Sequence, residues 1–326
     1  MKQVEEKAFD QEVELKIIKA VTLADQGCNH ECVRELEKIM AANENRSSGQ
    51  RSGPARQLSQ SNINKTNNTT NISNSKKDGN HDSNTSDQLL QMRMNLQGHK
   101  AHHQGRRHQF CLLMKSIIQR KIGEHEECVE TATECINKFP EFKDAYLVRG
   151  QINLLQKKSQ KAVQDFLEFN GLAAQEMMQM TQAVLPIPNG QAGGNKHQKI
   201  ASNIEQAQCL LRISIGKESL GDAYKKMKKY KLANQCYEES VGEISKIKVT
   251  KNQNKSFSDQ VGNLLHKVKL KIAMCAYYQG DMHRATAGMQ DVMAYYKGFD
   301  FETLKVQQKL IKVNFYLGKA ILSQIG

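Results

Sequence analysis

The chain of 326 residues has no tryptophan, and only 6% of its residues are aromatic. Hydrophobic residues make up 39%, which is little for a single globule with a deep core. An array of helical repeats tolerates this composition, because each repeat buries only a thin layer against its neighbours. No apolar run approaches the roughly 18 residues of a membrane span. The N-terminal sequence MKQVEEKAFDQEVELK has no apolar stretch typical of a secretory signal, so we expect a cytoplasmic protein, with ciliary and nuclear locations as alternatives.

Motifs that carry chemistry are also missing. The 8 cysteines include no Cys-x-x-Cys pair, and four of them fall on apolar helix faces, where a thiol packs as a small hydrophobe: Cys32, Cys128, Cys135 and Cys275. There is no phosphate-binding loop, no nucleophile elbow and no carboxylate pair in an apolar setting. The His-rich stretch 98–109 has no carboxylate or cysteine at ligand spacing, and we interpret it as a solvated basic linker. We therefore expect a protein that is not an enzyme and uses no cofactor or metal.

Acidic residues are too few to balance the basic ones, and the net charge is +13. The excess is local, since residues 217–271 hold 13 lysines and 6 acidic residues. A local excess of this kind favours an acidic partner surface over a general role in solubility. Within it, the run YKKMKKYK suggests a nucleic-acid contact. Because Tyr224, Met227 and Tyr230 have the spacing of a helix core, we interpret its lysines as the solvated side of a turn.

Apolar residues recur at helical spacing along most of the chain, and no strand-like alternation is found, which predicts an all-α fold. Residues 1–42 form an N-terminal helical hairpin that turns at Gly27. Residues 43–108 are dominated by Asn, Ser and His. Such a segment buries too little apolar surface to offset its ordering entropy, so we expect a disordered, low-complexity basic insert there. Within it, 88–96 (QLLQMRMNL) is a candidate transient helix.

Order is expected to resume with helix pairs over 109–185. Residues 186–199, which contain two prolines and three glycines, predict a linker. Further pairs follow over 200–326, and an amphipathic helix over 304–325 caps the chain.

Two small residues on apolar helix faces, Cys128 and Ala162, lie 34 residues apart with Pro140 between them. Repeated helix–turn–helix units of this length are typical of stacked arrays that present a concave surface to another macromolecule. The units resemble tetratricopeptide repeats (TPRs), in which small residues let the two helices of a pair approach closely. Repeats starting near 109, 142, 214 and 266 carry the resemblance, most clearly through Gly221, Tyr224, Ala233 and Tyr237. Phe169 departs from the pattern, because it is large where a small residue is expected.

The resemblance implies a TPR-like helical-hairpin solenoid whose concave groove is lined by the first helix of each pair. The groove would be apolar toward its N-terminal half and basic, with tyrosines, toward its C-terminal half. Such a surface suits an acidic protein segment with apolar anchors. The residues expected to line it for partner binding are Arg120, Gln151, Lys225, Lys226, Lys267, Lys271, Tyr277 and Tyr278.

We interpret the chain as a non-catalytic scaffold or adaptor that binds a protein segment and belongs to a larger complex. One alternative is an RNA-associated helical-repeat protein that uses the basic region 217–271, because phosphate contacts require such a surface. A second alternative is a structural subunit of a ciliary or cytoskeletal assembly, with 304–325 as a docking helix.

Overall fold

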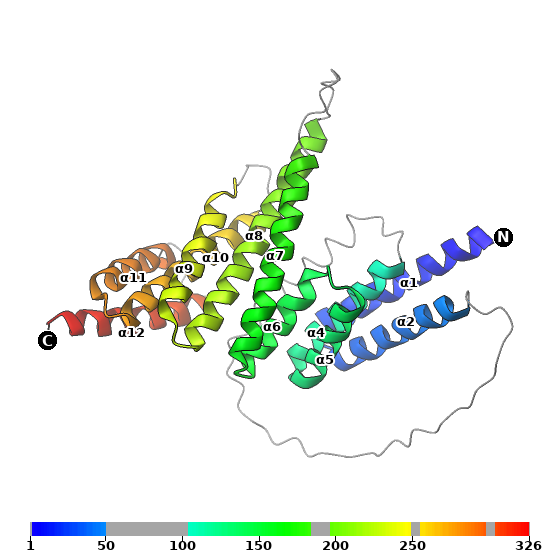
Figure 1. Ribbon diagram of the computed structural model, residues 1–326, viewed down its shortest axis with the longest axis horizontal. Coiled ribbons are helices and arrows are strands. Elements are labelled where there is room, and N and C mark those ends of the chain that lie inside the picture. Colours follow the sequence, from blue (N-terminus) through cyan, green and yellow to red (C-terminus); the bar gives the residue numbers. More distant parts are fainter. Residues whose placement is uncertain (1, 50–103, 184–195, 249–254, 298–303, 326) are drawn as a thin grey trace, which may run out of the picture. The chain divides into compact units, whose positions relative to one another are not determined.

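The structure, a computed structural model, describes residues 2–49, 104–183, 196–248, 255–297 and 304–325 (Figure 1). Throughout these ranges the regular structure is α-helical, which confirms the all-α prediction. The helices are α1 Lys2–Asp25, α2 Asn29–Gly49, α4 Gln104–Ile122, α5 His125–Lys138, α6 Lys143–Leu155, α7 Ser159–Ala183, α8 Lys196–Lys226, α9 Tyr230–Ser245, α10 Lys255–Tyr278, α11 Met282–Lys297 and α12 Leu304–Ile325.

The chain divides into two compact units, residues 1–135 and 136–326. In the first unit α1 and α2 form a hairpin, and α4 packs against α2. An ion pair of 2.7 Å between Lys115 Nζ and Glu37 Oε1 joins α4 to α2. The division falls within α5, although the sequence predicts one segment of helix pairs over 109–185. Helix α4 belongs to the first unit because it packs on α2.

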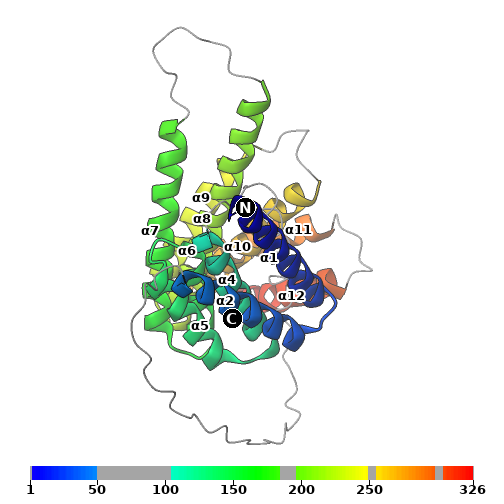
Figure 2. The same ribbon diagram turned by 90° about the vertical axis from the view of Figure 1, so that its right-hand side faces the viewer.

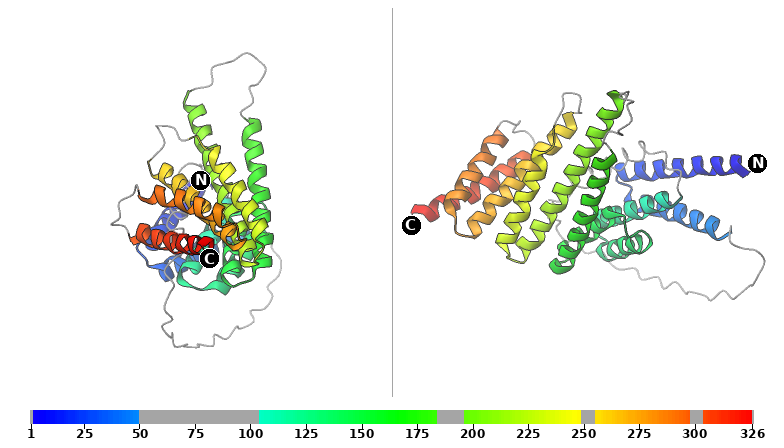
Figure 3. Two further views of the ribbon diagram at one scale, coloured as in Figure 1. Left: turned by 90° about the vertical axis from the view of Figure 1, so that its left-hand side faces the viewer. Right: turned by 45° about the horizontal axis from the view of Figure 1, so that its top comes forward.

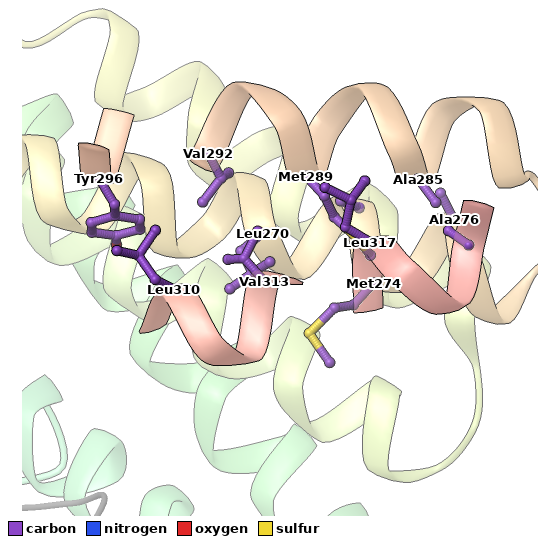
Figure 4. Close-up of a cluster of buried hydrophobic side chains, with 12 residues drawn as sticks. Leu270, Met274, Ala276, Ala285, Met289, Val292, Tyr296, Leu310, Val313 and Leu317 are labelled. Atoms are coloured by element: carbon purple, nitrogen blue, oxygen red, sulfur yellow. The ribbon is translucent and has the colours of Figure 1, made fainter. Parts of the chain in front are cut away.

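The second unit is a stack of hairpins, α6/α7, α8/α9 and α10/α11, followed by α12 (Figure 3). The first helices contact one another in the order α6, α8, α10 and α12, while the described parts of α7, α9 and α11 make no comparable contacts with one another. The first helices therefore lie on one side of the stack, which we call the first-helix face. Each layer of the core is shared by successive hairpins, as Figure 4 shows for α10, α11 and α12.

One turn geometry recurs in both units. Each hairpin turns at a residue with left-handed backbone, φ between 59° and 91°. The next N–H bonds back to a carbonyl of the preceding helix, as in Lys229 N to Tyr224 O at 2.9 Å, which closes the helix in a Schellman motif. Five residues after each left-handed residue comes a fully buried small one. The pairs are Gly27 and Cys32, Gly123 and Cys128, Lys157 and Ala162, Lys228 and Ala233, and Gly280 and Ala285.

Close contact between paired helices depends on glycine. A Cβ at Gly150 would lie 2.7 Å from Phe166 Cε1, and a Cβ at Gly221 would lie 2.5 Å from Tyr237 Cε1. Both aromatic rings are fully buried, so each fills the space above its glycine. The shared turn and this shared contact make the array a TPR-like solenoid. The out-of-pattern Phe169 is accommodated in the same way, because it packs against Gly216 of α8.

Helices α7 and α8 are longer than the pattern predicts. Helix α7 continues without a break through 169–172, and α8 begins at Lys196, inside the segment expected to be a linker. Their added turns extend past the neighbouring helices (Figures 1 and 2). This extension explains why Ala162 and Ala233 lie 71 residues apart, although Cys128 and Ala162 are separated by 34. Helix α2 likewise runs to Gly49, and the rest of the expected insert as far as residue 103 lies outside the described residues.

Candidate protein-interaction surface

The structure distributes the expected groove residues over four helices. Arg120 lies half-buried on α4 in the first unit, and Gln151 lies half-buried on α6 in the second. The remaining six come from α8 and α10, which are adjacent first helices: Lys225, Lys226, Lys267, Lys271, Tyr277 and Tyr278.

Two of the expected groove lysines are neutralised within the protein. Lys271 Nζ lies 2.5 Å from both Glu218 Oε1 and Asp222 Oδ2, and Lys267 Nζ lies 2.8 Å from Glu218 Oε1. Asp222 also accepts a hydrogen bond of 2.7 Å from the buried Tyr237 hydroxyl. This cluster links α8, α9 and α10, so its lysines serve the packing of the stack before they serve any partner.

The electrostatics of the cluster follow from its burial. Burial by itself would raise the pKa of Glu218, but the charges of Lys271 and Lys267 outweigh it and lower the pKa to about 2. For Lys271 burial would lower the pKa, but Asp222 and Glu218 hold it above its ordinary value. The charges are thus held in place at neutral pH and compensate each other.

Tyrosines gather beside this cluster, where α8, α9, α10 and α12 meet. Tyr278 is 42% exposed and stacks on Tyr230, with ring centroids 5.1 Å apart and an interplanar angle of 14°. Its hydroxyl lies 3.3 Å from that of Tyr316, and its ring packs edge-on against Tyr277. The hydrogen bond with Tyr316 raises the pKa of Tyr278 to about 12, so Tyr278 stays neutral. Lys225 Nζ lies 5.8 Å from the Tyr278 ring centroid, within cation–π range.

The lysines of the YKKMKKYK run differ from those of the cluster. Lys226, Lys228, Lys229 and Lys231 are exposed, and no carboxylate of the described residues lies within ion-pair distance of them. Three of them line a shallow hollow together with Tyr230, Leu232 and Gln279. Leu232 is 43% exposed there, so an apolar side chain lies among uncompensated charges.

These neighbouring features form what we call the tyrosine–lysine surface. The Tyr230–Tyr278 stack joins the basic run to the tyrosine pair of α10, two motifs that lie 46 to 54 residues apart in the sequence. The surface consists of Lys225, Lys226, Lys228, Lys229, Tyr230, Lys231, Leu232, Tyr278, Gln279 and Tyr316.

Seven residues of this surface were not predicted to bind a partner from the sequence: Lys228, Lys229, Tyr230, Lys231, Leu232, Gln279 and Tyr316. Tyr230 has the spacing of a core residue, and it is half-buried because its ring covers Tyr278. A usable signal exists in the repeat pattern, since Lys229 and Gln279 lie in the turns of successive hairpins, and Tyr230–Leu232 begin the helix that follows the first of these turns.

Other kinds of site find little support in the part of the chain that the structure describes. It contains no group of three or more His, Cys, Asp or Glu residues arranged to hold a metal ion. None of its helices is long and apolar enough to cross a membrane. The cysteines are free thiols, and all except Cys28 are buried, including the four predicted to pack on apolar helix faces.

No protein-family model and no curated protein sequence matches this chain. Similar solved structures include the yeast histone chaperone Hif1, described as a scaffold protein recruiting protein complexes to core histones, with 10% identity and a TM-score of 0.45 over 68% of this chain and 98% of the other. A tetratricopeptide repeat protein from Parabacteroides merdae has 14% identity and a TM-score of 0.28, over 93% and 99%. The APC/C hetero-tetramer Cut9–Hcn1 has 12% identity and a TM-score of 0.20, over 70% and 46%. At these scores the likeness carries no functional argument.

Proposed function

We propose that this protein is a non-catalytic scaffold that binds an acidic protein segment on the tyrosine–lysine surface. The observation that carries the proposal is the contrast between two sets of lysines. Lys267 and Lys271 are compensated by Glu218, whereas Lys228 and Lys229 surround an exposed leucine without a carboxylate partner among the described residues. Uncompensated charge beside an apolar hollow is what an acidic segment with one apolar anchor requires.

The start of α9 adds to the attraction. No side chain caps this helix at Lys229, so its first N–H groups are available to solvent or to a ligand. The partial positive charge of a helix N-terminus favours a carboxylate there. An acidic side chain of the partner would meet this end of α9, while its apolar neighbour covers Leu232. The partner segment would continue over the exposed ring of Tyr278.

RNA binding is the second candidate, because stacked tyrosines beside lysines also suit bases and phosphates. Two observations favour the protein segment. The hollow presents Leu232 between its lysines. Tyr278 has one ring face occupied by Tyr230, which leaves less of the ring for a base. Salt separates the two, since phosphate contacts make RNA affinity fall steeply as salt rises.

The test uses the full chain and a matched pair of variants. Lys157 and Lys158 occupy the turn of α6/α7 that corresponds to Lys228 and Lys229 in α8/α9, with the same left-handed backbone. Lys228→Glu/Lys229→Glu and Lys157→Glu/Lys158→Glu therefore change the net charge equally at equivalent positions, and only the first pair alters the hollow.

The probes are a labelled synthetic peptide with alternating Asp and Glu around one leucine, and a labelled single-stranded oligouridylate, each titrated by fluorescence anisotropy. We expect the peptide to bind the wild type, to lose at least tenfold in affinity with Lys228→Glu/Lys229→Glu, and to lose less than threefold with Lys157→Glu/Lys158→Glu. Equal losses of affinity in the two double variants would show that only the net charge of the protein matters, and this would contradict the proposal. Tighter binding of the oligouridylate than of the peptide at physiological salt would replace it by RNA binding.

A further inference from the structure

Helix α12 exposes an apolar stripe on the side away from α10 and α11. Ile311 is 68% exposed, Phe315 55% and Leu322 71%, and Gly318 completes the row at helical spacing. The opposite side of α12 is buried against α10 and α11 through Leu310, Val313, Leu317 and Ala320 (Figure 4). Helix α12 therefore has two apolar sides, and no described helix covers the second.

The preceding hairpins show what normally covers this side of a first helix. Gly150 of α6 lies beneath Phe166 of α7, and Gly221 of α8 lies beneath Tyr237 of α9. Gly318 takes the same place in α12, directly after Leu317, as Gly221 follows Leu220 in α8. A Cβ at Gly318 would meet nothing within 4 Å. We call the uncovered space above Gly318 the socket. An aromatic ring fills the corresponding space above Gly150 and Gly221, whereas no described side chain fills it in α12.

The hairpins also share a charge pattern. A cation on the first helix pairs with a carboxylate on the second, in Lys19 with Glu35, Arg149 with Asp165, Lys217 with Glu243, and Lys269 with Asp291. The sequence of α12 contains four lysines and no acidic residue, so it offers cations and no carboxylate to a second helix. Lys319 Nζ lies 4.5 Å from the ring centroid of Phe315, at the edge of the stripe.

We propose that α12 is the first half of an intermolecular hairpin, completed by an acidic amphipathic helix of a partner protein. The partner helix would place a large side chain, aromatic or methionine, over Gly318, as Phe166 covers Gly150 and Tyr237 covers Gly221. Its apolar side would cover Ile311, Phe315 and Leu322. Its carboxylates would face the lysines of α12. This stripe borders the tyrosine–lysine surface at Tyr316, whose ring packs edge-on against that of Phe315 with centroids 5.4 Å apart.

Two other occupants fit less well. A second copy of α12 would bring two helices together that each carry four lysines and no acidic residue, which charge repulsion disfavours. The chain's own segment 88–96 is apolar, but it carries Arg93 and no acidic residue, so it lacks the complementary charge. An acidic helix from another protein satisfies the socket, the stripe and the charge together.

The experiment places the photo-cross-linker benzoylphenylalanine at position 311 or 322 of the full chain and irradiates it in lysate of its own cells. Cross-linked peptides are then sequenced by mass spectrometry. We expect a peptide with a net negative charge, apolar residues at helical spacing, and an aromatic residue or methionine among them. A synthetic copy of that peptide should bind the purified full chain in anisotropy titrations.

Glycine variants make the test specific. A Cβ at position 318 meets nothing within 4 Å, so we expect Gly318→Leu to fill the socket while the fold is retained and the melting temperature does not fall. We expect this variant to weaken binding of the synthetic peptide at least tenfold. A Cβ at Gly242, on α9, likewise meets nothing within 4 Å, so Gly242→Leu should leave binding unchanged. Cross-links to a second copy, to residues 50–103 or to non-acidic peptides would overturn the proposal, as would their absence or equal binding by Gly318→Leu.

Discussion

The contact between Gly221 and Tyr237 allows a quantitative prediction from a single methyl group. Carbon atoms in optimal contact lie about 3.5–4.0 Å apart, whereas the Cβ of Gly221→Ala would lie 2.5 Å from Tyr237 Cε1 and 2.7 Å from Cδ1. The ring would have to move by roughly 1 Å. It cannot do so freely, because it is fully buried and its hydroxyl donates a hydrogen bond to Asp222.

Two opposing effects set the size of the change. Alanine is favoured over glycine inside a helix by about 1 kcal/mol. Overpacking a rigid contact costs about 1–3 kcal/mol. Because the overlap involves two ring carbons and a pinned ring, we expect Gly221→Ala to lower the free energy of unfolding by about 1–2 kcal/mol net. At roughly 2–4 °C per kcal/mol for a unit of this size, the melting temperature should fall by about 2–8 °C.

The assay is thermal and urea unfolding of the full chain, followed by far-ultraviolet circular dichroism. Gly171→Ala in α7 is the matched control, since its Cβ meets nothing within 4 Å, and it should raise stability by up to about 1 kcal/mol. In a Tyr237→Leu background, Gly221→Ala should cost less than it does in the wild type. If Gly221→Ala and Gly171→Ala shift the melting temperature in the same direction, the close-packing account of this hairpin is wrong.

The remaining predictions concern turns, charge and core. Lys157→Gly should raise the free energy of unfolding by about 1 kcal/mol, because its left-handed backbone strains any residue with a Cβ; Gly123→Ala should lower it by a similar amount, both measured by urea unfolding. The stabilisation from ionised Glu218 is present above its unfolded pKa of 4.5 and should be lost as pH falls toward about 2, a change of about 3 kcal/mol. Glu218→Gln should flatten that part of the stability–pH curve, and an unchanged curve would contradict the ion-pair assignment. Phe169→Ala should cost about 3–5 kcal/mol in the same unfolding assay, because the ring fills the space over Gly216, and a loss below 1 kcal/mol would show that this space is not close-packed.

Much of the fold could be predicted because the repeat places its constraints in the sequence. Small residues at Cys128, Ala162 and Ala233 identify the second helix of three hairpins, and all three are fully buried. The turns were harder to see, because Lys157 and Lys228 take a left-handed conformation that glycine usually supplies. Local propensity alone gives no sign of it. The left-handed position is revealed only by its constant distance of five residues from the buried small residue that follows it.

The candidate surface could be predicted only in part, because pairing between repeats is a tertiary property. The pattern placed Lys267 and Lys271 on a first-helix face, but not against Glu218 and Asp222, which lie about fifty residues earlier. Both carboxylates lie on α8, the first helix of the preceding hairpin. Whether Glu218 and Asp222 neutralise the lysines depends on how far α8 and α10 are shifted along each other. The sequence does not give this shift, because segments of unequal length separate the repeats.

The location of the partner segment is tested most directly by amide hydrogen exchange of the full chain, with and without the acidic peptide probe. Because the first N–H groups of α9 have no side-chain cap, they should exchange quickly in the free protein. The account predicts that the peptide slows exchange at Tyr230–Leu232 and at Gln279. Protection confined to the first-helix face around Glu218 and Lys271, with none at the start of α9, would contradict it.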